Sequence, residues 1–233
     1  QIEEELKSLG ADYEVVNYED LIDQTSDYLS KEKAIGWFQG RMEFGPRALG
    51  GRSILGDPRS DKMQKNLNLK VKYRESFRPF APSVLKEDLS DWFDINVDSP
   101  YMLLVADINL DKQIQMSDEQ KKLFGIDKLN IKRSEIPAVT HVDYSARIQT
   151  VDKKYNKYYY DLIAKFKEKT GCPVVVNTSF NVRGEPIVST PSDAFNCFMG
   201  TELDYLVIGN CILDKTKQNP NLKKDYTKEF ELD

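Results

Sequence analysis

The sequence predicts an α/β fold in which helices cover a sheet. Short apolar runs, some of them rich in β-branched residues, alternate along the 233 residues with segments whose apolar positions follow a helical period. Glycine and proline separate these segments, and no internal repeat or low-complexity tract interrupts them. Hydrophobic residues make up 40% of the chain, enough to bury a core within one large domain or two small ones.

The first half of the chain predicts three helices and two strands. The first helix ends at Gly10, and the second has apolar side chains at a helical spacing and runs directly into a buried apolar strand. A loop rich in glycine and proline then leads to a brief strand and a third helix. The expected helices are residues 1–9, 19–33 and 60–69, and the expected strands are residues 34–38 and 53–55.

The second half predicts four strands and two helices. Gly171 is a stop signal for one helix, and Thr190, followed by a proline and an acidic residue, is a start signal for the other. The residues after Asp214 are polar and are expected to be loosely held. The expected strands are residues 101–108, 137–151, 173–176 and 205–213, and the expected helices are residues 156–170 and a segment that begins at residue 190.

Composition excludes several protein classes. No apolar run approaches the roughly 18 residues of a membrane span, and the acidic start of the chain does not have the pattern of a signal peptide. Cys172, Cys197 and Cys211 are odd in number and widely spaced in apolar stretches, so they predict buried thiols rather than disulfides or a zinc knuckle. They favour a reducing, cytoplasmic location. His141 is the single histidine, so a His-based metal cluster cannot be built from this chain alone.

Charge is distributed unevenly. Residues 1–35 carry 3 basic and 10 acidic side chains, a net charge of −7, whereas residues 36–86 carry 11 basic and 4 acidic ones, a net charge of +7. A cationic run is often only a solvated face. Here, however, arginines are interleaved with glycine and proline, and the planar guanidinium suits phosphate and carboxylate groups. The segment therefore predicts an anionic ligand, either a nucleotide or a nucleic acid.

Two segments of this basic stretch are suited to hold an anion. Residues 40–50 have glycines five apart after a strand, but Pro46 and Arg47 replace the Lys and Ser/Thr of a P-loop, which excludes a Walker-type NTPase. What remains is a flexible loop that can direct backbone N–H groups and two arginines at an anion. Residues 72–82 place three cations beside aromatic and proline residues, and the prolines restrict the backbone on either side.

Two further segments add polar groups. Residues 141–150 contain His141 and an arginine, although a lone histidine is most often structural. Residues 177–186 place small polar groups and an arginine where a strand ends, and ligands commonly bind at the carboxyl ends of strands in α/β sheets. Together the four segments predict a site for a nucleotide-sized polyanion.

These residues carry a family resemblance. The matching stretches are residues 36–40, 47–50, 52–55, 57–59, 72–82, 140–143, 146–151 and 177–181. They resemble the C-terminal domain of NodU/CmcH-type O-carbamoyltransferases. The resemblance places this domain at residues 34–214, with residues 1–33 as a helical lead-in of the same domain and residues 215–233 as a polar tail. One departure is Tyr144, which stands where the family usually has glycine.

The resemblance implies a YrdC-like fold, a twisted and mostly parallel sheet with a cationic concave surface. In the family this domain forms carbamoyl adenylate from ATP and carbamoyl phosphate. A separate N-terminal domain of the actin-like ATPase type, with a His-ligated iron, then transfers the carbamoyl group to a hydroxyl acceptor. This chain is therefore expected to be the adenylate-forming half only, with that domain as its partner. Mg²⁺ is expected to accompany ATP, held largely by phosphates and water.

The resemblance also implies roles for ten residues. The residues expected to be catalytic, as clamps for phosphate or carbamoyl groups, are Arg47, Lys72, Arg78 and Arg147, with His141 assisting near the carbamoyl group. The residues expected to bind the cofactor ATP are Arg41, Asn177, Ser179, Asn181 and Arg183.

Two other functions remain open from the sequence. A nucleic-acid-binding, YrdC-like module without catalysis would explain the basic segment, but the whole chain is acidic and has no RRM, KH or zinc-knuckle signature. A docking domain that has lost catalysis would not need every cationic motif residue that is present.

Overall fold

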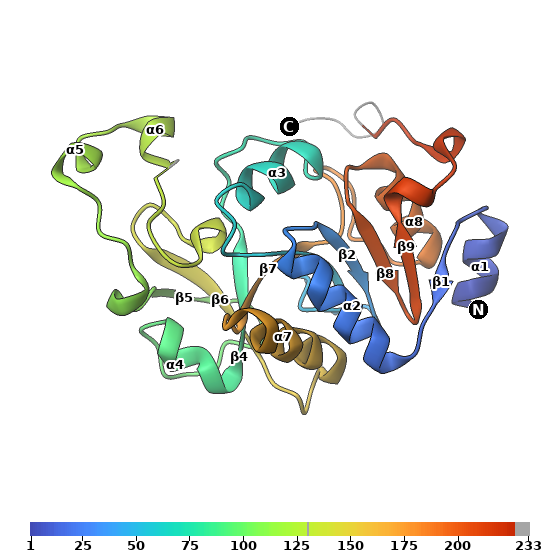
Figure 1. The fold of residues 1–233 in the computed structure, drawn as a ribbon, viewed down its shortest axis with the longest axis horizontal. Helices are drawn as coiled ribbons and strands as arrows, with labels where there is room; N and C mark the ends of the chain where they lie inside the picture. Colours follow the sequence, from blue (N-terminus) through green and yellow to red (C-terminus); the bar gives the residue numbers. More distant parts are fainter. Residues whose placement is uncertain (130, 227–233) are drawn as a thin grey trace.

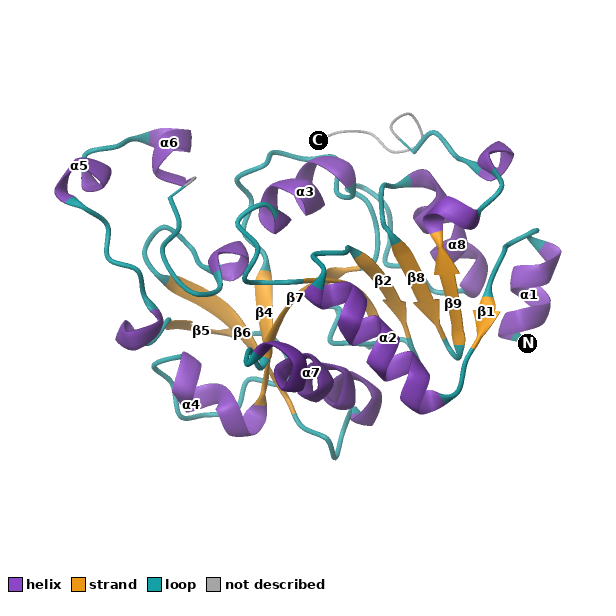
Figure 2. Ribbon diagram, viewed as in Figure 1, coloured by secondary structure: helices purple, strands orange, loops and turns teal. Residues whose placement is uncertain are grey.

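One sheet of nine strands runs through the protein, and helices pack on it (Figures 1 and 2). The computed structural model describes residues 1–129 and 131–226. In this part of the chain the strands are β1 (Glu14–Val15), β2 (Ile35–Phe38), β3 (Arg52–Gly56), β4 (Ala81–Leu85), β5 (Leu104–Asp107), β6 (Ser145–Val151), β7 (Val174–Ser179), β8 (Tyr205–Ile208) and β9 (Cys211–Asp214). The α-helices are α1 (Ile2–Ser8), α2 (Tyr18–Ser30), α3 (Met63–Lys70), α4 (Leu89–Trp92), α5 (Asp118–Lys121), α6 (Gly125–Leu129), α7 (Lys157–Thr170) and α8 (Pro191–Gly200).

The strand order is β1-β9-β8-β2-β3-β7-β4-β6-β5. The α/β class and the helical cover are confirmed, but the expected mostly parallel arrangement is corrected by the pairing. Only β2 with β8 and β4 with β6 are parallel, and the other six pairs are antiparallel. Two pairs of successive strands, β2 with β3 and β8 with β9, are antiparallel neighbours joined without the helical crossover that parallel strands need.

Most of the expected elements are present, and two differ. Residues 137–144 form a short 3-10 turn (Pro137–Val139) and a loop, so β6 begins later than expected. Residues 205–213 form a hairpin rather than one strand, because Gly209 takes a positive φ of 56° and reverses the chain. Strand β4 was not predicted from the sequence, and it carries Pro82, a residue type that is uncommon inside a sheet.

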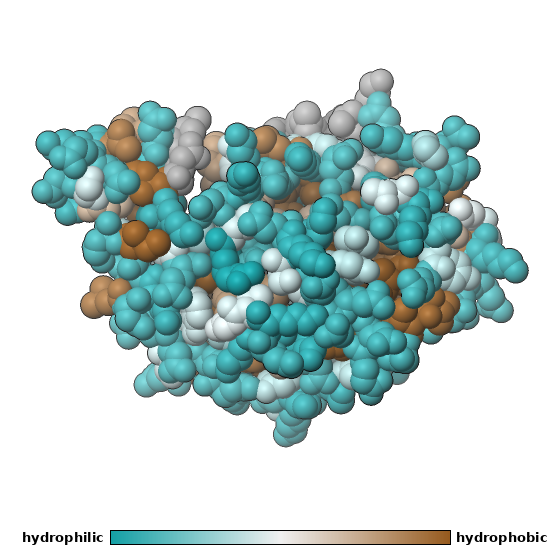
Figure 3. Space-filling model, viewed as in Figure 1, coloured by the Kyte–Doolittle hydropathy of each residue, from teal (hydrophilic) through white to brown (hydrophobic). Residues whose placement is uncertain are grey.

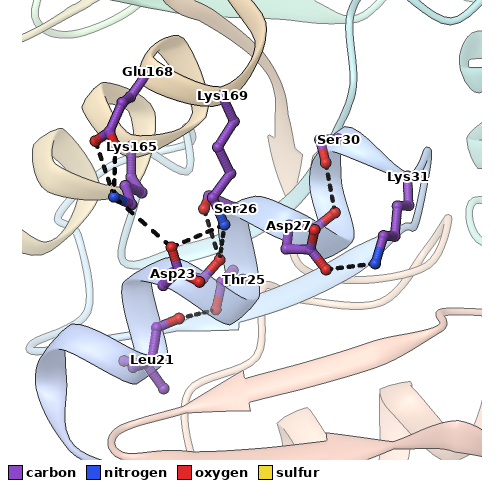
Figure 4. A network of polar contacts seen from close by, with 10 residues as sticks. All are labelled: Leu21, Asp23, Thr25, Ser26, Asp27, Ser30, Lys31, Lys165, Glu168 and Lys169. Carbon is purple, nitrogen blue, oxygen red and sulfur yellow. Dashed lines mark hydrogen bonds and ion pairs between the residues drawn. The ribbon is translucent and has the colours of Figure 1, made fainter.

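Helices α2 and α7 lie side by side in front of the sheet (Figure 2). Each buries one apolar stripe in the core and exposes a polar face. Between these polar faces Asp23 of α2 forms ion pairs with Lys165 at 3.8 Å and Lys169 at 3.0 Å on α7 (Figure 4). On α2 itself the exposed Lys31 is paired with Asp27 at 2.7 Å. Helix α7 ends as expected at Gly171, which is left-handed with a φ of 76°.

The two ends of the chain contribute to the same sheet and core. Strand β1 pairs with β9, and Leu6 and Leu21 are fully buried. In the tail, the amide of Gln218 donates 2.8 and 2.9 Å hydrogen bonds to the backbone oxygens of Asp12 and Asp214, and the buried Tyr226 packs over Gly200. This correction of the expected loose tail applies up to residue 226, and residues 227–233 lie outside the described residues.

The surface facing the viewer is largely hydrophilic (Figure 3). Apolar groups gather near the arm that carries α5 and α6, which projects away from the sheet, and toward the end of the sheet at β1 (Figures 1 and 3). Within residues 1–129 and 131–226, no helix has the length and apolar content that crossing a membrane requires.

The close packing of the loop before β3 can be tested at Gly50. Its φ is +107°, and a Cβ there would lie 2.2 Å from Cδ1 of Tyr159 on α7. We expect Gly50→Ala to lower the free energy of unfolding by roughly 2–4 kcal/mol, through left-handed backbone strain and overpacking against the ring. Urea denaturation measures this difference.

Gly40 in the same loop is the matched control. It also has a positive φ, +61°, but a Cβ there would meet nothing within 4 Å. Gly40→Ala should therefore cost only the backbone strain, about 1–2 kcal/mol. Equal losses for the two variants would contradict the close packing of Gly50 on Tyr159.

Candidate functional site

The candidate residues flank one end of five adjacent strands. The carboxyl ends of β2 and β7 lie beside the amino ends of β3, β4 and β6, because Phe38 pairs with Arg52, Ser53 with Ser179, Ala81 with Asn177, and Ser83 with Gln149. The segments 39–51, 72–80, 141–147 and 179–183 continue from these strand ends. We call this end of the sheet, with these four segments, the basic rim. All ten residues expected from the sequence belong to the basic rim or to the strands that form it.

Lys72 is buried at the rim, with only 3% of its surface exposed. Its ammonium donates to the backbone oxygens of Ser179 at 2.5 Å and Asn181 at 2.8 Å, and to Oδ1 of Asn181 at 2.8 Å. Burial lowers the pKa of Lys72 to about 7. Since an ammonium has three donors, these protein oxygens already satisfy Lys72, which links the chain before β4 to the end of β7.

The segment after β7 is held by its own side chains as well. Oγ of Ser179 donates to Oδ1 of Asn181 at 2.7 Å, and Nδ2 of Asn181 donates to the backbone oxygen of Glu185 at 2.6 Å. The carboxylate of Glu185 in turn accepts a 2.8 Å hydrogen bond from the backbone N–H of Val182. These contacts give the turn that contains Arg183 a fixed shape.

Asn177 lies deeper than its expected role suggests, with 1% of its surface exposed. Its Nδ2 donates to Oε1 of Gln149 at 2.8 Å, to Oγ of Ser83 at 3.1 Å and to the backbone oxygen of Ala48 at 3.0 Å. Gln149 donates to the backbone oxygen of Leu49 at 2.8 Å. The Asn177–Gln149–Ser83 network therefore spans three strands and holds the loop that carries Arg47.

This loop, residues 39–51, was expected to be flexible, and its base is instead firmly tied. The guanidinium of Arg52 donates to the backbone oxygens of Gln39 at 3.0 Å, Gly40 at 3.1 Å and Gly51 at 2.9 Å, and it stacks 3.4 Å from the ring centre of Phe38. Residues 40–42 and the tip, residues 44–46, are exposed, whereas Ala48, Gly50 and Gly51 are buried. Because buried backbone oxygens cannot bond to bulk water, they need donors within the protein, and Arg52 supplies them at the base of the loop.

Arg47 and Arg147 approach each other from the loop and from β6. Burial and the charge of Arg47 both lower the pKa of Arg147. In each arginine the Nε atom is buried and has no hydrogen-bond partner. Two like charges with orphaned buried donors are unfavourable unless an anion lies between them, so this pair has the character of an anion site.

His141 lies close to the same arginine. Burial lowers its pKa below the ordinary value, and the charges of Arg147 and Arg133 lower it further. The turn after it is closed by Tyr144, whose N–H donates to the backbone oxygen of His141 at 3.0 Å. Tyr144 has a φ of 67°, the left-handed conformation for which glycine is the usual residue.

A second cationic group consists of Arg74, Arg78 and Arg183. Burial and the charges of Arg78 and Arg183 lower the pKa of Arg74 to about 10. Glu75 is the nearby acid, 3.0 Å from Nε of Arg78 and 3.8 Å from Arg183. The sequence analysis did not select Arg74 among the site residues. Its position two residues from Lys72, in the same proline-flanked segment, was the available signal.

Arg41 lies apart from these two groups. It is exposed and lines a cleft of about 850 Å³ on the other side of the loop, together with Tyr101, Tyr155 and Tyr158. As for metals, no three His, Cys, Asp or Glu side chains come together in the described ranges 1–129 and 131–226, so we assign no side-chain site for Mg²⁺.

Comparison with known proteins places this site in a family. Residues 26–215 match the family model described as carbamoyltransferase C-terminus. The chain is 56% identical over its whole length to an uncharacterized protein of Synechocystis, and 40% identical over 91% of its length to nodulation protein NolO of Bradyrhizobium diazoefficiens. It is 33% identical, over 81% of its length, to the 3'-hydroxymethylcephem-O-carbamoyltransferase of Amycolatopsis lactamdurans.

A solved structure shares the fold. Full-length HypF, crystallised in a phosphate- and nucleotide-bound form, matches 88% of this chain with a TM-score of 0.50 and 15% sequence identity, and the match covers 23% of HypF. The chain spans 38%, 35% and 32% of the lengths of the three curated relatives. The family match covers most of the chain and includes every candidate residue, so the chain belongs to the carbamoyltransferase C-terminus family.

Proposed function

We propose that this chain forms carbamoyl adenylate from ATP and carbamoyl phosphate at the basic rim. The observation that carries the proposal is the Arg47–Arg147 pair, in which each guanidinium has a buried Nε without an acceptor. A phosphate or carbamate oxygen between them would supply both acceptors and offset the burial and the repulsion that lower the pKa of Arg147. Membership of the carbamoyltransferase family supports a carbamoyl compound as the anion.

The proposed reaction has two steps. Water first releases the phosphoryl group of carbamoyl phosphate as inorganic phosphate, which leaves carbamate. A carbamate oxygen then bonds to the α-phosphorus of ATP, the bond from that phosphorus to the bridging oxygen breaks, and pyrophosphate leaves with the electron pair. Both steps bring anions together, so fixed cations that neutralise the charge would supply most of the catalysis.

The two cationic groups divide these tasks in the proposal. Arg47 and Arg147 hold the carbamoyl phosphate and then the carbamate, with His141 beside them. Arg74, Arg78 and Arg183 hold the phosphates of ATP, which enters as its Mg²⁺ complex. Lys72 positions Ser179 and Asn181 through its three shortest hydrogen bonds, 2.5–2.8 Å long, rather than binding phosphate itself. Asn177 positions the Arg47 loop.

The proposal assigns the two halves of the chemistry, adenylation and carbamoyl transfer, to two different domains. The relatives are longer than the region they share with this chain. We assign the transfer of the carbamoyl group to a hydroxyl acceptor, and any iron it requires, to an N-terminal domain of the type that the family resemblance implies. The described residues provide one cationic rim, which suits the adenylation step.

Arginine variants test the anion site. We expect Arg47→Ala, Arg147→Ala and Arg78→Ala each to lower kcat/KM for carbamoyl phosphate-dependent AMP and pyrophosphate formation by about a hundredfold, close to 3 kcal/mol, because a charge-assisted transition-state contact is lost. Chromatography of the nucleotides measures the rate. Lys31→Ala, which removes an exposed cation on α2 (Figure 4), is the control and should stay within twofold. Near-normal rates for the arginine variants would overturn the assignment.

The single histidine reports on the same anion by NMR. We expect the pKa of His141 in the free protein to lie below 6.5, and to rise on addition of inorganic phosphate by on the order of one unit, since an adjacent anion favours imidazolium. By linkage, the contribution of His141 to phosphate affinity should grow as the pH falls through this range and the imidazole is protonated. In Arg147→Ala the free pKa should already be higher and should respond less to phosphate. A pKa that saturating phosphate leaves unchanged would place the anion elsewhere.

The division of labour has its own test. We expect this chain, given ATP, carbamoyl phosphate, Mg²⁺ and a panel of sugar-like hydroxyl compounds, to form carbamoyl adenylate or its breakdown products without carbamoylating any acceptor. The physical reason is that transfer requires a second site, which positions a hydroxyl and polarises the carbamoyl carbonyl. Mass spectrometry detects the products. A carbamoylated acceptor made by this chain alone would contradict the proposal.

A further inference from the structure

Glu43 closes the loop that presents Arg47. Its Oε1 atom accepts hydrogen bonds from the backbone N–H of Leu49 at 3.0 Å and of Gly51 at 2.5 Å. These two N–H groups lie on the chain after Arg47, whereas Glu43 lies before it. One carboxylate therefore joins the two arms of a nine-residue loop, with Arg47 between them.

The other hydrogen bonds that hold residues 48–50 come from side chains outside the loop, which donate to backbone carbonyl oxygens. Asn177 donates to the oxygen of Ala48, Gln149 to that of Leu49, and Nε1 of Trp37 to that of Gly50 at 2.9 Å. These contacts fix one arm of the loop on the sheet. The start of the other arm is held by Arg52, which donates to the oxygens of Gln39 and Gly40, and Glu43 adds a second link nearer to Arg47. The charge of Glu43 also favours the charged form of Arg52.

The space around the carboxylate is fitted to it. A Cβ on Gly51 would lie 2.9 Å from Oε1 of Glu43 and 3.2 Å from the backbone oxygen of Arg41, so a side chain at this position would crowd the carboxylate. The tip of the loop, by contrast, is unsupported. Phe44 there is completely exposed. Without the Glu43 contacts, the tip and Arg47 would be free to move away from Arg147.

We propose that Glu43 is a positioning residue for Arg47. Its carboxylate holds the loop closed, so that the guanidinium of Arg47 stays beside Arg147 and needs little ordering when the anion binds. The role in catalysis rests on the proposed function, because it requires that Arg47 holds the reacting anion. The structural part of the inference, the ordering of Arg47 by Glu43, stands on the hydrogen bonds alone.

The test compares three variants of the full chain. Glu43→Ala removes both contacts, Glu43→Gln keeps an oxygen that can accept them, and Met42→Ala alters the adjacent, half-exposed side chain as the matched control. The first readout is the Nε–Hε NMR signal of Arg47, assigned by its absence in Arg47→Ala, together with hydrogen exchange of the Leu49 and Gly51 amides. We expect a weakened Arg47 signal and faster exchange in Glu43→Ala, and wild-type behaviour in Met42→Ala.

The second readout is the affinity for inorganic phosphate, measured by calorimetry in single and double variants. We expect Glu43→Ala to weaken binding by about tenfold, Glu43→Gln to restore most of it, and Glu43→Ala to cost nothing further in an Arg47→Ala background. A loss of the same size in both backgrounds would overturn the positioning role, as would an unchanged Arg47 signal in Glu43→Ala. Should Glu43→Ala fail to fold, the same comparisons are made between Glu43→Gln and Met42→Ala. A weaker Arg47 signal and a partial loss of phosphate affinity in Glu43→Gln alone support the positioning role, and equal results for the two variants contradict it.

If the proposed function is wrong but the role of Glu43 is right, the experiments give a different combination of results. In that case wild-type protein forms no AMP from ATP and carbamoyl phosphate, while the Arg47 signal still depends on Glu43. If catalysis is as proposed and Glu43 positions Arg47, kcat/KM for carbamoyl phosphate falls in parallel with the affinity for phosphate, and Glu43→Gln recovers both.

Discussion

An amide side chain buried in the middle of the sheet determines where the catalytic candidates lie. Asn177 is almost completely buried, so its Nδ2 needs acceptors within the protein, and those acceptors are Gln149, Ser83 and the backbone of Ala48. The requirement links β7, β4 and β6 to the loop before β3. If this network were replaced by apolar side chains, the sheet could still pack, but the Arg47 loop would lose its attachment to the strands beneath it.

The alternation of helices and strands could be predicted from the sequence, because it depends on local periodicity and on strong punctuation. The helix at residues 157–170 ends at Gly171 in the left-handed conformation, and the last helix begins with Thr190 as its N-cap and a proline behind it, as expected. Strand direction could not be predicted in the same way. It depends on which strands become neighbours, and the hairpin at Gly209 and the proline inside β4 each oppose the local pattern.

The candidate site shows a similar division. Motif position identified the segments of the basic rim, and the register of five adjacent strands brings these segments together. Motif position could not distinguish side chains that are free to bind a ligand from side chains that hold the neighbouring segments in place. Lys72 and Asn177 have the residue types of ligand-binding groups, yet their donors are taken by protein oxygens. Arg74 and Glu43 gain their importance from contacts that only the folded chain reveals.

The turn at Tyr144 has a consequence for how distant parts of the molecule communicate. The projecting arm, residues 108–129 and 131–135, is bound to this turn at both of its ends (Figure 1). Ile108 donates its N–H to the oxygen of Tyr144, and the hydroxyl of Tyr144 reaches the oxygen of Ile114 at 3.3 Å. At the other end, Arg133 donates to the oxygen of His141 at 3.2 Å. A displacement of either end of the arm would therefore act on a turn whose Tyr144 is already in the left-handed conformation, and that turn follows directly on His141.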